Sequence, residues 1–237
     1  MTWRAESAMY TLYIANKNYS SWSLRPWVLL REHAIAFQER LVAFEGPSNR
    51  TLFRRFSPNG KVPCLVDADR TVWDSLAIAE YLAERHEGMW PADPDARAWA
   101  RCATAEMHSG FSALREMCSM NCGLRVRLHT ISNALAQDLE RVGELFGEGI
   151  ARYGGPFLAG ASFTVVDAFF APVAFRVQTY ELPLDAAAAG YCQRLLGLAS
   201  MRQWYEEALR EPWREPAHEA EALRSGSRLG DLRGLAP

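Results

Sequence analysis

The sequence predicts an α/β domain followed by an all-helical domain, and two observations carry that prediction. Short β-rich runs alternate with helical patterns over roughly the first 86 residues. After segment 89–94, which contains two prolines, long helical patterns follow with almost no strand signal. We therefore expect a first domain over residues 1–88, a linker over 89–94 and an all-helical domain over 95–237.

The first domain has the predicted element order β-α-β-α-β-β-α. Residues Met9–Ala15 form a β-rich run, and apolar residues then recur at helical spacing over Ser21–His33. Pro26 is expected in the first turn of this helix, where its missing N–H loses no partner. The other elements are predicted strands over 36–44, 61–66 and 71–73, a short helix or turn over 49–56 and a helix over 75–85. This order indicates a mixed sheet covered by helices.

The second domain has four long helical patterns, over residues 95–118, 128–153, 164–177 and 191–210. Thr164 and Asp167 have the spacing of a capping box at the start of the third pattern. Pro172 inside that helix predicts a kink. The C-terminal arginines are offset by nearby acidic residues, which predicts a solvated tail containing Arg224, Arg228 and Arg233.

The composition is that of a soluble globular protein, with 49% hydrophobic residues, 23% charged residues and a net charge of −2. Such a balance argues against binding to nucleic acid or to an anionic membrane. No run approaches the ~20 apolar residues of a membrane span, and residues 1–9 lack the apolar core of a secretory signal. The five cysteines have no CxxC spacing and no metal-ligand pattern. We expect a cytoplasmic protein with reduced thiols and no metal.

Three serines, Ser20, Ser21 and Ser23, stand where the first strand passes into the first helix. The N-terminus of a helix presents free backbone N–H groups and the positive end of the helix dipole. One serine is enough to cap the helix. The others favour a second role, in which a spare hydroxyl donates a hydrogen bond to a thiolate.

Two further segments have features suited to a peptide-like ligand. Pro63 follows Val62 where a strand begins and is a candidate cis-proline, which would turn the backbone groups of Val62 outward. Asp74 and Ser75 begin the next helix, where they can cap it or hold the amino and carboxylate groups of a γ-glutamyl moiety. Taken singly, Pro63 is explained equally well by a trans proline at a strand start, and Asp74 or Ser75 is explained better by a simple helix cap.

In this order, the motifs resemble the glutathione transferase superfamily from about Met9 to Leu209. The stretch Ser20-Ser-Trp-Ser-Leu-Arg25 is similar to the Ser-Ser-Cys-x-x-Arg loop of the zeta class, the maleylacetoacetate isomerases, except that Trp22 replaces the cysteine. Segments 16–27 and 106–111 look more like a bacterial branch of serine-type transferases. The resemblance implies a thioredoxin-like domain, a C-terminal helical bundle and a homodimer.

The resemblance also implies roles for individual residues. Glutathione would be the co-substrate, with its thiolate stabilised by Ser20 or Ser21 and positive potential added by Arg25. The remaining glutathione contacts that it implies are those of Lys61, Val62, Pro63, Asp74 and Ser75. For the second-substrate pocket, the candidate lining residues are Trp22, Met107, Phe111 and Met120, although the helical spacing of Met107 and Phe111 is also typical of plain core.

Four functions are compatible with these features. The first is a transferase that attacks a small hydrophobic electrophile. The second is a glutathione-dependent cis–trans isomerase of the maleylacetoacetate type, which needs cations such as Arg25 and Arg115 for a diacid. The third is a non-catalytic binding protein with this fold. The fourth, a thiol–disulfide oxidoreductase, is disfavoured because the first loop has no cysteine.

Overall fold

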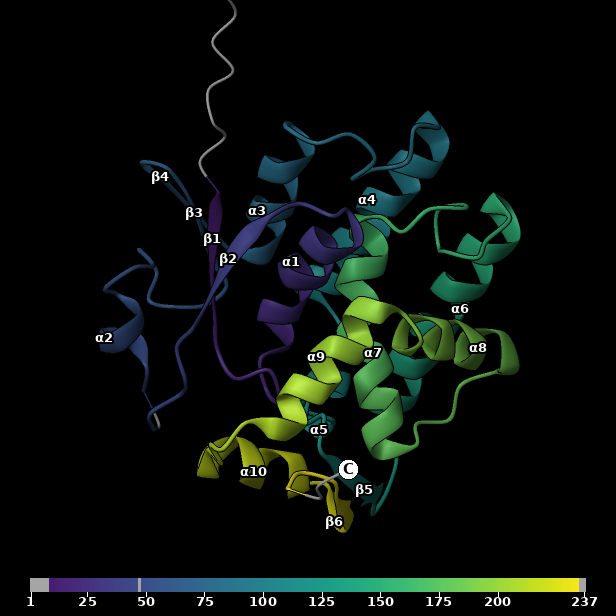
Figure 1. Ribbon diagram of the computed structural model, residues 1–237. Coiled ribbons are helices and arrows are strands. Elements are labelled where there is room, and N and C mark those ends of the chain that lie inside the picture. Colours follow the sequence, from purple (N-terminus) through teal and green to yellow (C-terminus); the bar gives the residue numbers. More distant parts are fainter. Residues whose placement is uncertain (1–8, 47, 235–237) are drawn as a thin grey trace, which may run out of the picture.

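The computed structural model describes residues 9–46 and 48–234, so the interpretation of the first eight residues lies outside it. Its main sheet is mixed and has the strand order β2-β1-β3-β4 (Figure 1). The strands are β1 (Tyr10–Ile14), β2 (Phe37–Leu41), β3 (Cys64–Asp67) and β4 (Arg70–Trp73). Strand β1 pairs parallel with β2 and antiparallel with β3, so that Leu12 lies opposite both Glu39 and Leu65. The predicted element order and the mixed sheet are confirmed.

The helices of the first half are α1 (Ser21–Glu32), α2 (Arg50–Phe53) and α3 (Ser75–Ala83). Helices α1 and α3 contact each other on one side of the sheet, and α2 lies apart from them (Figure 1). Leu24 and Val28 of α1 are fully buried because the helix is covered by the sheet on one side and by the second half on the other. Pro26 lies in the second turn of α1, one turn later than expected.

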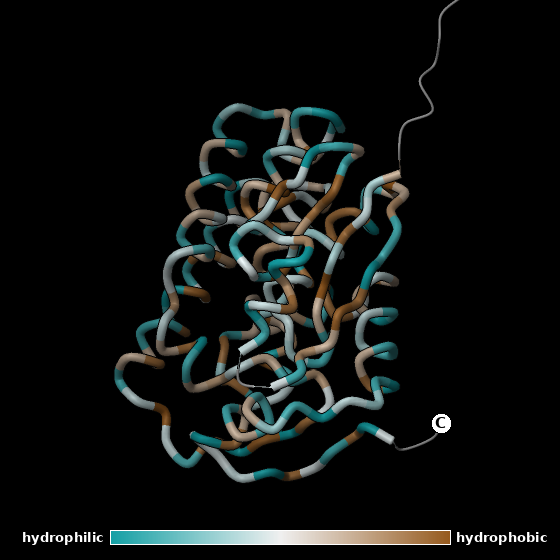
Figure 2. The backbone as a smooth tube through the Cα atoms, turned by 90° about the vertical axis from the view of Figure 1, so that its left-hand side faces the viewer, coloured by the Kyte–Doolittle hydropathy of each residue, from teal (hydrophilic) through white to brown (hydrophobic). Residues whose placement is uncertain are grey.

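The helices of the second half are α4 (Pro94–Ser109), α5 (Ser112–Met117), α6 (Asn133–Tyr153), α7 (Val165–Tyr180), α8 (Ala186–Leu196), α9 (Ala199–Arg210) and α10 (Pro216–Leu223). Helix α7 is the central one: it is almost wholly buried and contacts α1, α4 and α8. Its predicted capping box between Thr164 and Asp167 is present. In Figure 2 the hydrophobic stretches gather in the interior of the chain trace and the hydrophilic stretches follow its outer turns.

Two of the predicted long helices are interrupted. The helix predicted over 95–118 breaks at Gly110 and Phe111, where Phe111 has a left-handed backbone with φ of 60°. The helix predicted over 191–210 is divided between α8 and α9 at Gly197 and Leu198. Both breaks coincide with a glycine, the residue that costs a helix interior most after proline.

The second half also contains a two-stranded antiparallel sheet that the sequence patterns did not indicate. Strand β5 (Leu124–Leu128) pairs antiparallel with β6 (Gly226–Asp231), so α6 begins later than predicted. The expectation of a solvated tail was wrong for Arg233, which is 7% exposed and forms ion pairs with Glu219 and with Asp231, the latter at 2.7 Å. The pairing of strands about 100 residues apart leaves no local signature, which is why the pattern analysis missed it.

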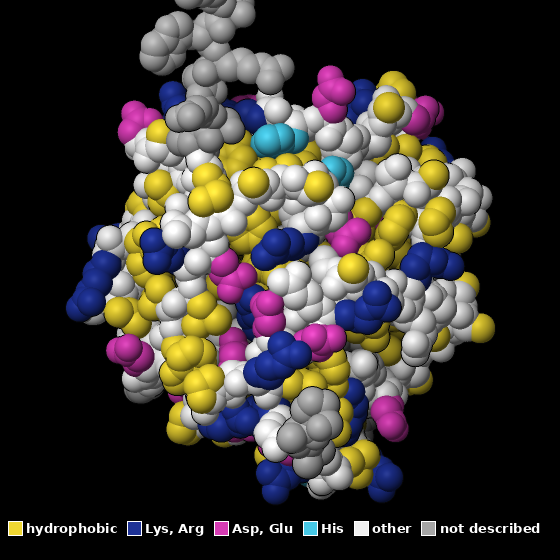
Figure 3. Space-filling view, viewed as in Figure 1, with side chains coloured by type: hydrophobic (Ala, Val, Ile, Leu, Met, Phe, Trp, Pro, Cys, Tyr) yellow, Lys and Arg dark blue, Asp and Glu magenta, His cyan; other side chains and the backbone are white. Residues whose placement is uncertain are grey.

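The surface is mixed in charge, and nothing in the described segments has the length and apolarity of a membrane-crossing helix. On the face seen in Figure 3, basic and acidic side chains are interspersed between hydrophobic ones.

The segment 89–94 is attached to the central helix, because the backbone N–H of Val165 donates to the carbonyl of Met89 at 2.9 Å. The start of α1 is therefore held between the sheet and a firmly attached helical half.

Candidate functional site

The serine cluster lies at the N-terminus of α1, and its three hydroxyls differ in their surroundings. Ser20 is the N-cap residue, but its hydroxyl makes no capping bond and instead donates to Ser23 Oγ at 2.7 Å. Ser23 is fixed from the other side, since it accepts the backbone N–H of Ala15 at 3.3 Å. All three serines are buried. Ser20 and Ser23 thus form a connected pair within the loop.

Ser21 is bound to a different part of the molecule. Its hydroxyl oxygen accepts a hydrogen bond from Nη2 of Arg176 at 3.4 Å. Arg176, on α7, is 4% exposed, and its other nitrogens donate to the carbonyls of Cys118 and Pro172. Burial lowers the pKa of Arg176 to about 10, so the guanidinium remains charged at neutral pH. Arg176 carries no local sequence signal, because it is an isolated arginine in a largely apolar helix.

Arg25 brings a second buried positive charge to the same place. Its side chain is 1% exposed and lies between the rings of Trp22, at 4.1 Å, and Phe169, at 4.6 Å. Nη1 donates to Ser75 Oγ at 3.3 Å, and its Nε has no hydrogen-bond partner. Burial lowers the pKa of Arg25. Within the described part of the chain no carboxylate lies within 4 Å of this guanidinium, which is unusual for a buried charge.

The start of α3 lies beside Arg25. Asp74 caps this helix by accepting the N–H of Leu76 at 2.8 Å, and its backbone has φ of 74°, an uncommon value for a residue other than glycine. Nε2 of His108 approaches the Asp74 carboxylate at 3.6 Å, and Nδ1 lies 3.5 Å from Arg25. Burial lowers the pKa of His108, and the nearby charges of Arg25 and Arg115 act in the same direction against the carboxylate of Asp74. The structure therefore brings Arg25, Asp74, Ser75 and His108 together.

The segment before β3 contains the other predicted contacts. The Val62–Pro63 peptide bond is cis, which confirms the prediction for this proline. Val62 is half-buried and Lys61 is exposed, with its backbone N–H donating to Asn59 Oδ1 at 2.9 Å. Because β3 pairs with β1, this segment lies at the same end of the sheet as the loop that leads into α1.

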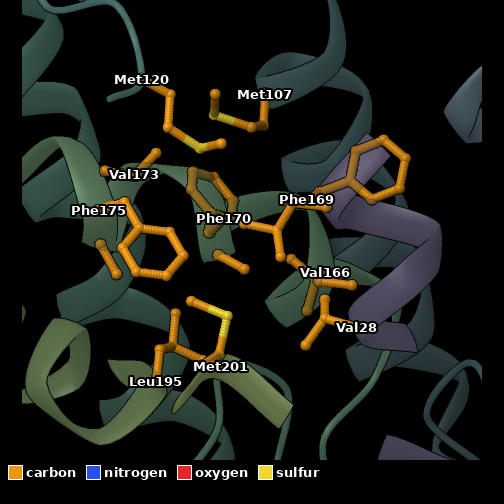
Figure 4. Close-up of a cluster of buried hydrophobic side chains, with 14 of the residues drawn as sticks. Val28, Met107, Met120, Val166, Phe169, Phe170, Val173, Phe175, Leu195 and Met201 are labelled. Carbon is orange, nitrogen blue, oxygen red and sulfur yellow. The ribbon is translucent and has the colours of Figure 1, made fainter. Parts of the chain in front are cut away.

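Three of the four residues suggested for a second-substrate pocket lie in the hydrophobic core. Met107, Phe111 and Met120 are 0%, 7% and 3% exposed, and Figure 4 shows both methionines beside Phe170. Trp22 is the exposed member, at 36%. The side chains of His108 and Arg115 contact its ring, with the His108 centroid at 5.3 Å and the Arg115 guanidinium at 5.0 Å. The surroundings of Trp22 are therefore basic and aromatic.

The cysteines are unsuited to the chemistry of this site. All five are free thiols, and four of them are buried. Burial raises the pKa of Cys64 to about 11 and that of Cys118 to about 12, so neither forms a thiolate near neutral pH. Among residues 9–46 and 48–234, no three His, Cys, Asp or Glu side chains are grouped as metal ligands.

The comparisons with known proteins concern the N-terminal domain and the fold. The family model for the glutathione S-transferase N-terminal domain matches residues 19–85, which contain the serine cluster, the cis-proline and the start of α3. A solved structure of a Burkholderia glutathione transferase homologue with bound glutathione has a TM-score of 0.64 at 24% identity, covering 84% of this chain and 98% of that one.

Two curated relatives cover most of both chains. A stringent starvation protein A homologue of Pasteurella multocida is 25% identical over 165 residues, which are 69% of this chain and 72% of that protein. A probable maleylacetoacetate isomerase of Caenorhabditis elegans is 24% identical over 177 residues, which are 73% of this chain and 81% of that protein. These similarities extend well beyond the matched N-terminal domain into the helical half.

Proposed function

We propose that this chain, which belongs to the cytosolic glutathione transferase superfamily, binds glutathione and stabilises its thiolate for attack on a small electrophile. The observation that carries the proposal is the pair of buried guanidinium groups, Arg25 and Arg176, which lie beside serine hydroxyls and form no ion pair with a carboxylate among the described residues. Asp74 is the acidic side chain of this site, and two guanidinium groups leave an excess of positive charge that a glutathione thiolate and its two carboxylates would balance.

The chemistry requires the pKa of the glutathione thiol to fall. A free thiol has a pKa near 8.5, so only a few per cent is ionised at neutral pH, and lowering that pKa by ~2 needs about 2.7 kcal/mol of stabilisation of the anion. One hydroxyl hydrogen bond and the N-terminus of α1 can supply about that much. Serine does not act as a base at this pH, so its role is to donate a hydrogen bond.

We assign that hydrogen bond to Ser21. The oxygen of Ser21 accepts from the charged Arg176, which polarises the hydroxyl and leaves its proton free for the sulfur. The hydroxyl proton of Ser20 is directed to Ser23. Arg176 thereby acts through Ser21 and adds its own positive charge to the site.

The other ends of glutathione fit the remaining residues. Arg25 and Ser75 would hold the γ-glutamyl carboxylate, and Asp74 would accept from the γ-glutamyl amino group. The backbone of Val62 would pair with the cysteinyl part, and Lys61 would contact the glycyl carboxylate. The superfamily relationship further supports a homodimer and a cytoplasmic location as proposals.

The second substrate would approach over Trp22. A small hydrophobic electrophile suits its exposed ring. Isomerisation of a diacid is a second candidate function. It is favoured by Arg115, which contacts the ring of Trp22 and has no carboxylate within 4 Å among the described residues, and by the similarity to the nematode protein.

The test is an ultraviolet difference titration of bound glutathione with the wild type, Ser21→Ala and Ser20→Ala. We expect a thiolate band near neutral pH in the wild type. The band should move to higher pH in Ser21→Ala, by about 1 to 2 pH units, and less in Ser20→Ala. If the wild type binds no glutathione, the proposal is wrong. If only Ser20→Ala moves the band, the assignment to Ser21 is wrong while the function stands.

A further inference from the structure

The loop that carries the serines is held by a carboxylate from the far end of the chain. Glu211 directly follows α9 and is 7% exposed. Its Oε1 accepts the backbone N–H of Lys17 at 2.6 Å, and its Oε2 accepts that of Asn18 at 3.2 Å. One carboxylate therefore binds two consecutive backbone amides of the loop between β1 and α1, across almost 200 residues of sequence.

Neighbouring groups hold the same loop on its other sides. The indole N–H of Trp204, on α9, donates to the Lys17 carbonyl at 2.9 Å. The Asn18 side chain donates to Asn121 at 3.0 Å and accepts the N–H of Gly123 at 2.9 Å. In Figure 1 the loop after β1 descends to the end of the molecule where α9 and α10 lie. The second half thus binds the loop through both its backbone and its side chains.

The held backbone is continuous with the serines. The N–H of Ser20 donates to the Asn16 carbonyl at 2.9 Å, and the N–H of Ser21 donates to the Tyr19 carbonyl at 2.9 Å. These bonds make a tight turn in which a displacement of Lys17 or Asn18 would also move the hydroxyls. Catalytic groups lose much of their effect when they move by about 0.5 to 1 Å.

We propose that Glu211 is a positioning residue for thiol activation, because its carboxylate fixes the loop that places Ser21 at the start of α1. The proposal rests on the proposed function, since it concerns the same thiolate. Glu211 does not touch glutathione; it acts through the backbone of Lys17 and Asn18.

The position of Glu211 is costly for stability, which favours a functional reason for it. Burial raises the pKa of Glu211 to about 7, even though the two backbone N–H groups act in the opposite direction. The ionisable groups that face it are Lys17 from the loop, Arg214 from the segment after α9, and Cys122 from the segment before β5. The ammonium of Lys17 is engaged by Glu39, at 2.8 Å, and by Glu207, so it does not form an ion pair with Glu211. Carboxyl groups with a strongly shifted pKa occur more often at functional sites than elsewhere.

The decisive variant is Glu211→Gln in the full chain, because glutamine keeps the shape but offers only one acceptor atom. We expect the pKa of the bound glutathione thiol to rise by about 1, measured by ultraviolet difference titration. We expect the melting temperature at pH 8 to stay equal to that of the wild type or to rise. A purely structural role would give the opposite pattern, with a lower melting temperature and an unchanged thiol pKa.

Glu207→Gln is the matched control, since Glu207 binds the side chain of Lys17 and not the loop backbone. It should leave the thiol pKa unchanged. If Glu211→Gln does not fold, amide hydrogen exchange of the wild type tests whether the Glu211 carboxylate holds the loop. The protection of the Lys17 and Asn18 amides against exchange should fall as the pH is lowered through about 7. Constant protection would overturn the proposal. A wild type without a thiolate band would instead refute the proposed function.

Discussion

The start of α1 and the core around α7 are both buried, yet they are built from opposite kinds of side chain. The first contains Ser21, Arg25, Arg176 and Glu211, each less than a tenth exposed. The second is a cluster of aromatic, aliphatic and methionine side chains around Phe170 (Figure 4). Burying apolar surface stabilises a fold, whereas burying charges without partners costs stability. The free energy gained by burying the apolar core therefore offsets the free energy lost by burying the charged site.

Helix α7 joins the two regions. Its apolar side chains pack into the core, and its Arg176 reaches Ser21. The two regions can therefore be separated by substitution. Changes in the core should lower stability and leave the thiol pKa unchanged, whereas changes at the charged site should alter glutathione binding or the thiol pKa without lowering stability.

The largest expected effect is that of Phe170→Ala in the core. Phe170 is fully buried and packs edge-to-face on Phe146, with ring centroids 5.1 Å apart. Removing the ring should lower the free energy of unfolding by about 3 to 5 kcal/mol, measured by urea denaturation. The protein that remains folded should keep the wild-type thiol pKa. A shifted thiol pKa in this variant would show that the two regions are not separable.

The next effect is expected for Arg25→Gln at the charged site. Loss of a charged donor to the γ-glutamyl carboxylate should weaken glutathione binding about 10-fold to 100-fold, measured by titration calorimetry. The melting temperature should not fall, because the guanidinium has no carboxylate partner within 4 Å among the described residues. Arg31→Gln, on the exposed side of the same helix, is the control and should leave binding unchanged.

The pH dependence of the free energy of unfolding also distinguishes the charged site from the apolar core. The folded pKa of Glu211, about 7, lies above its ordinary value near 4.5, so the folded protein binds a proton that the unfolded chain releases between these values. The wild type should therefore lose about 2 kcal/mol relative to Glu211→Gln as the pH rises from 5 to 8. Chemical denaturation of both proteins at each pH measures this difference. A constant difference would mean that Glu211 is ionised throughout.

The smallest expected effect is that of Arg176→Gln. Glutamine is shorter than arginine and has no charge, so the hydroxyl of Ser21 loses its charged donor and the pKa of the bound thiol should rise by about 1. The same ultraviolet titration measures it. If Arg176 acts through the hydroxyl of Ser21, the bound thiol should have the same pKa in the double variant Arg176→Gln, Ser21→Ala as in Ser21→Ala alone. Additive shifts would indicate that its charge acts on the sulfur directly.

Much of the local structure could be predicted because its determinants lie close together in the sequence. Alternation and helical spacing indicated the strands and helices, and Thr164 with Asp167 indicated the capping box that α7 has. The cis-proline after Val62 was also predicted from its place at a strand start. The helix breaks at Gly110 and Gly197 were missed, because a single glycine weakens a helix without ending it in every context.

By itself, the sequence determined the strands and helices of the first half and the positions of the long helical segments of the second, and it indicated serines, Asp74 and Ser75 at helix starts. Only the tertiary structure decided which serine is polarised, what surrounds Arg25 and what holds the loop. The physical reason is that the partners of Ser21 and Lys17 lie 155 and 194 residues further along the chain. Hydrogen bonds between such distant groups depend on how the helical half packs on the sheet, and no local pattern encodes that packing.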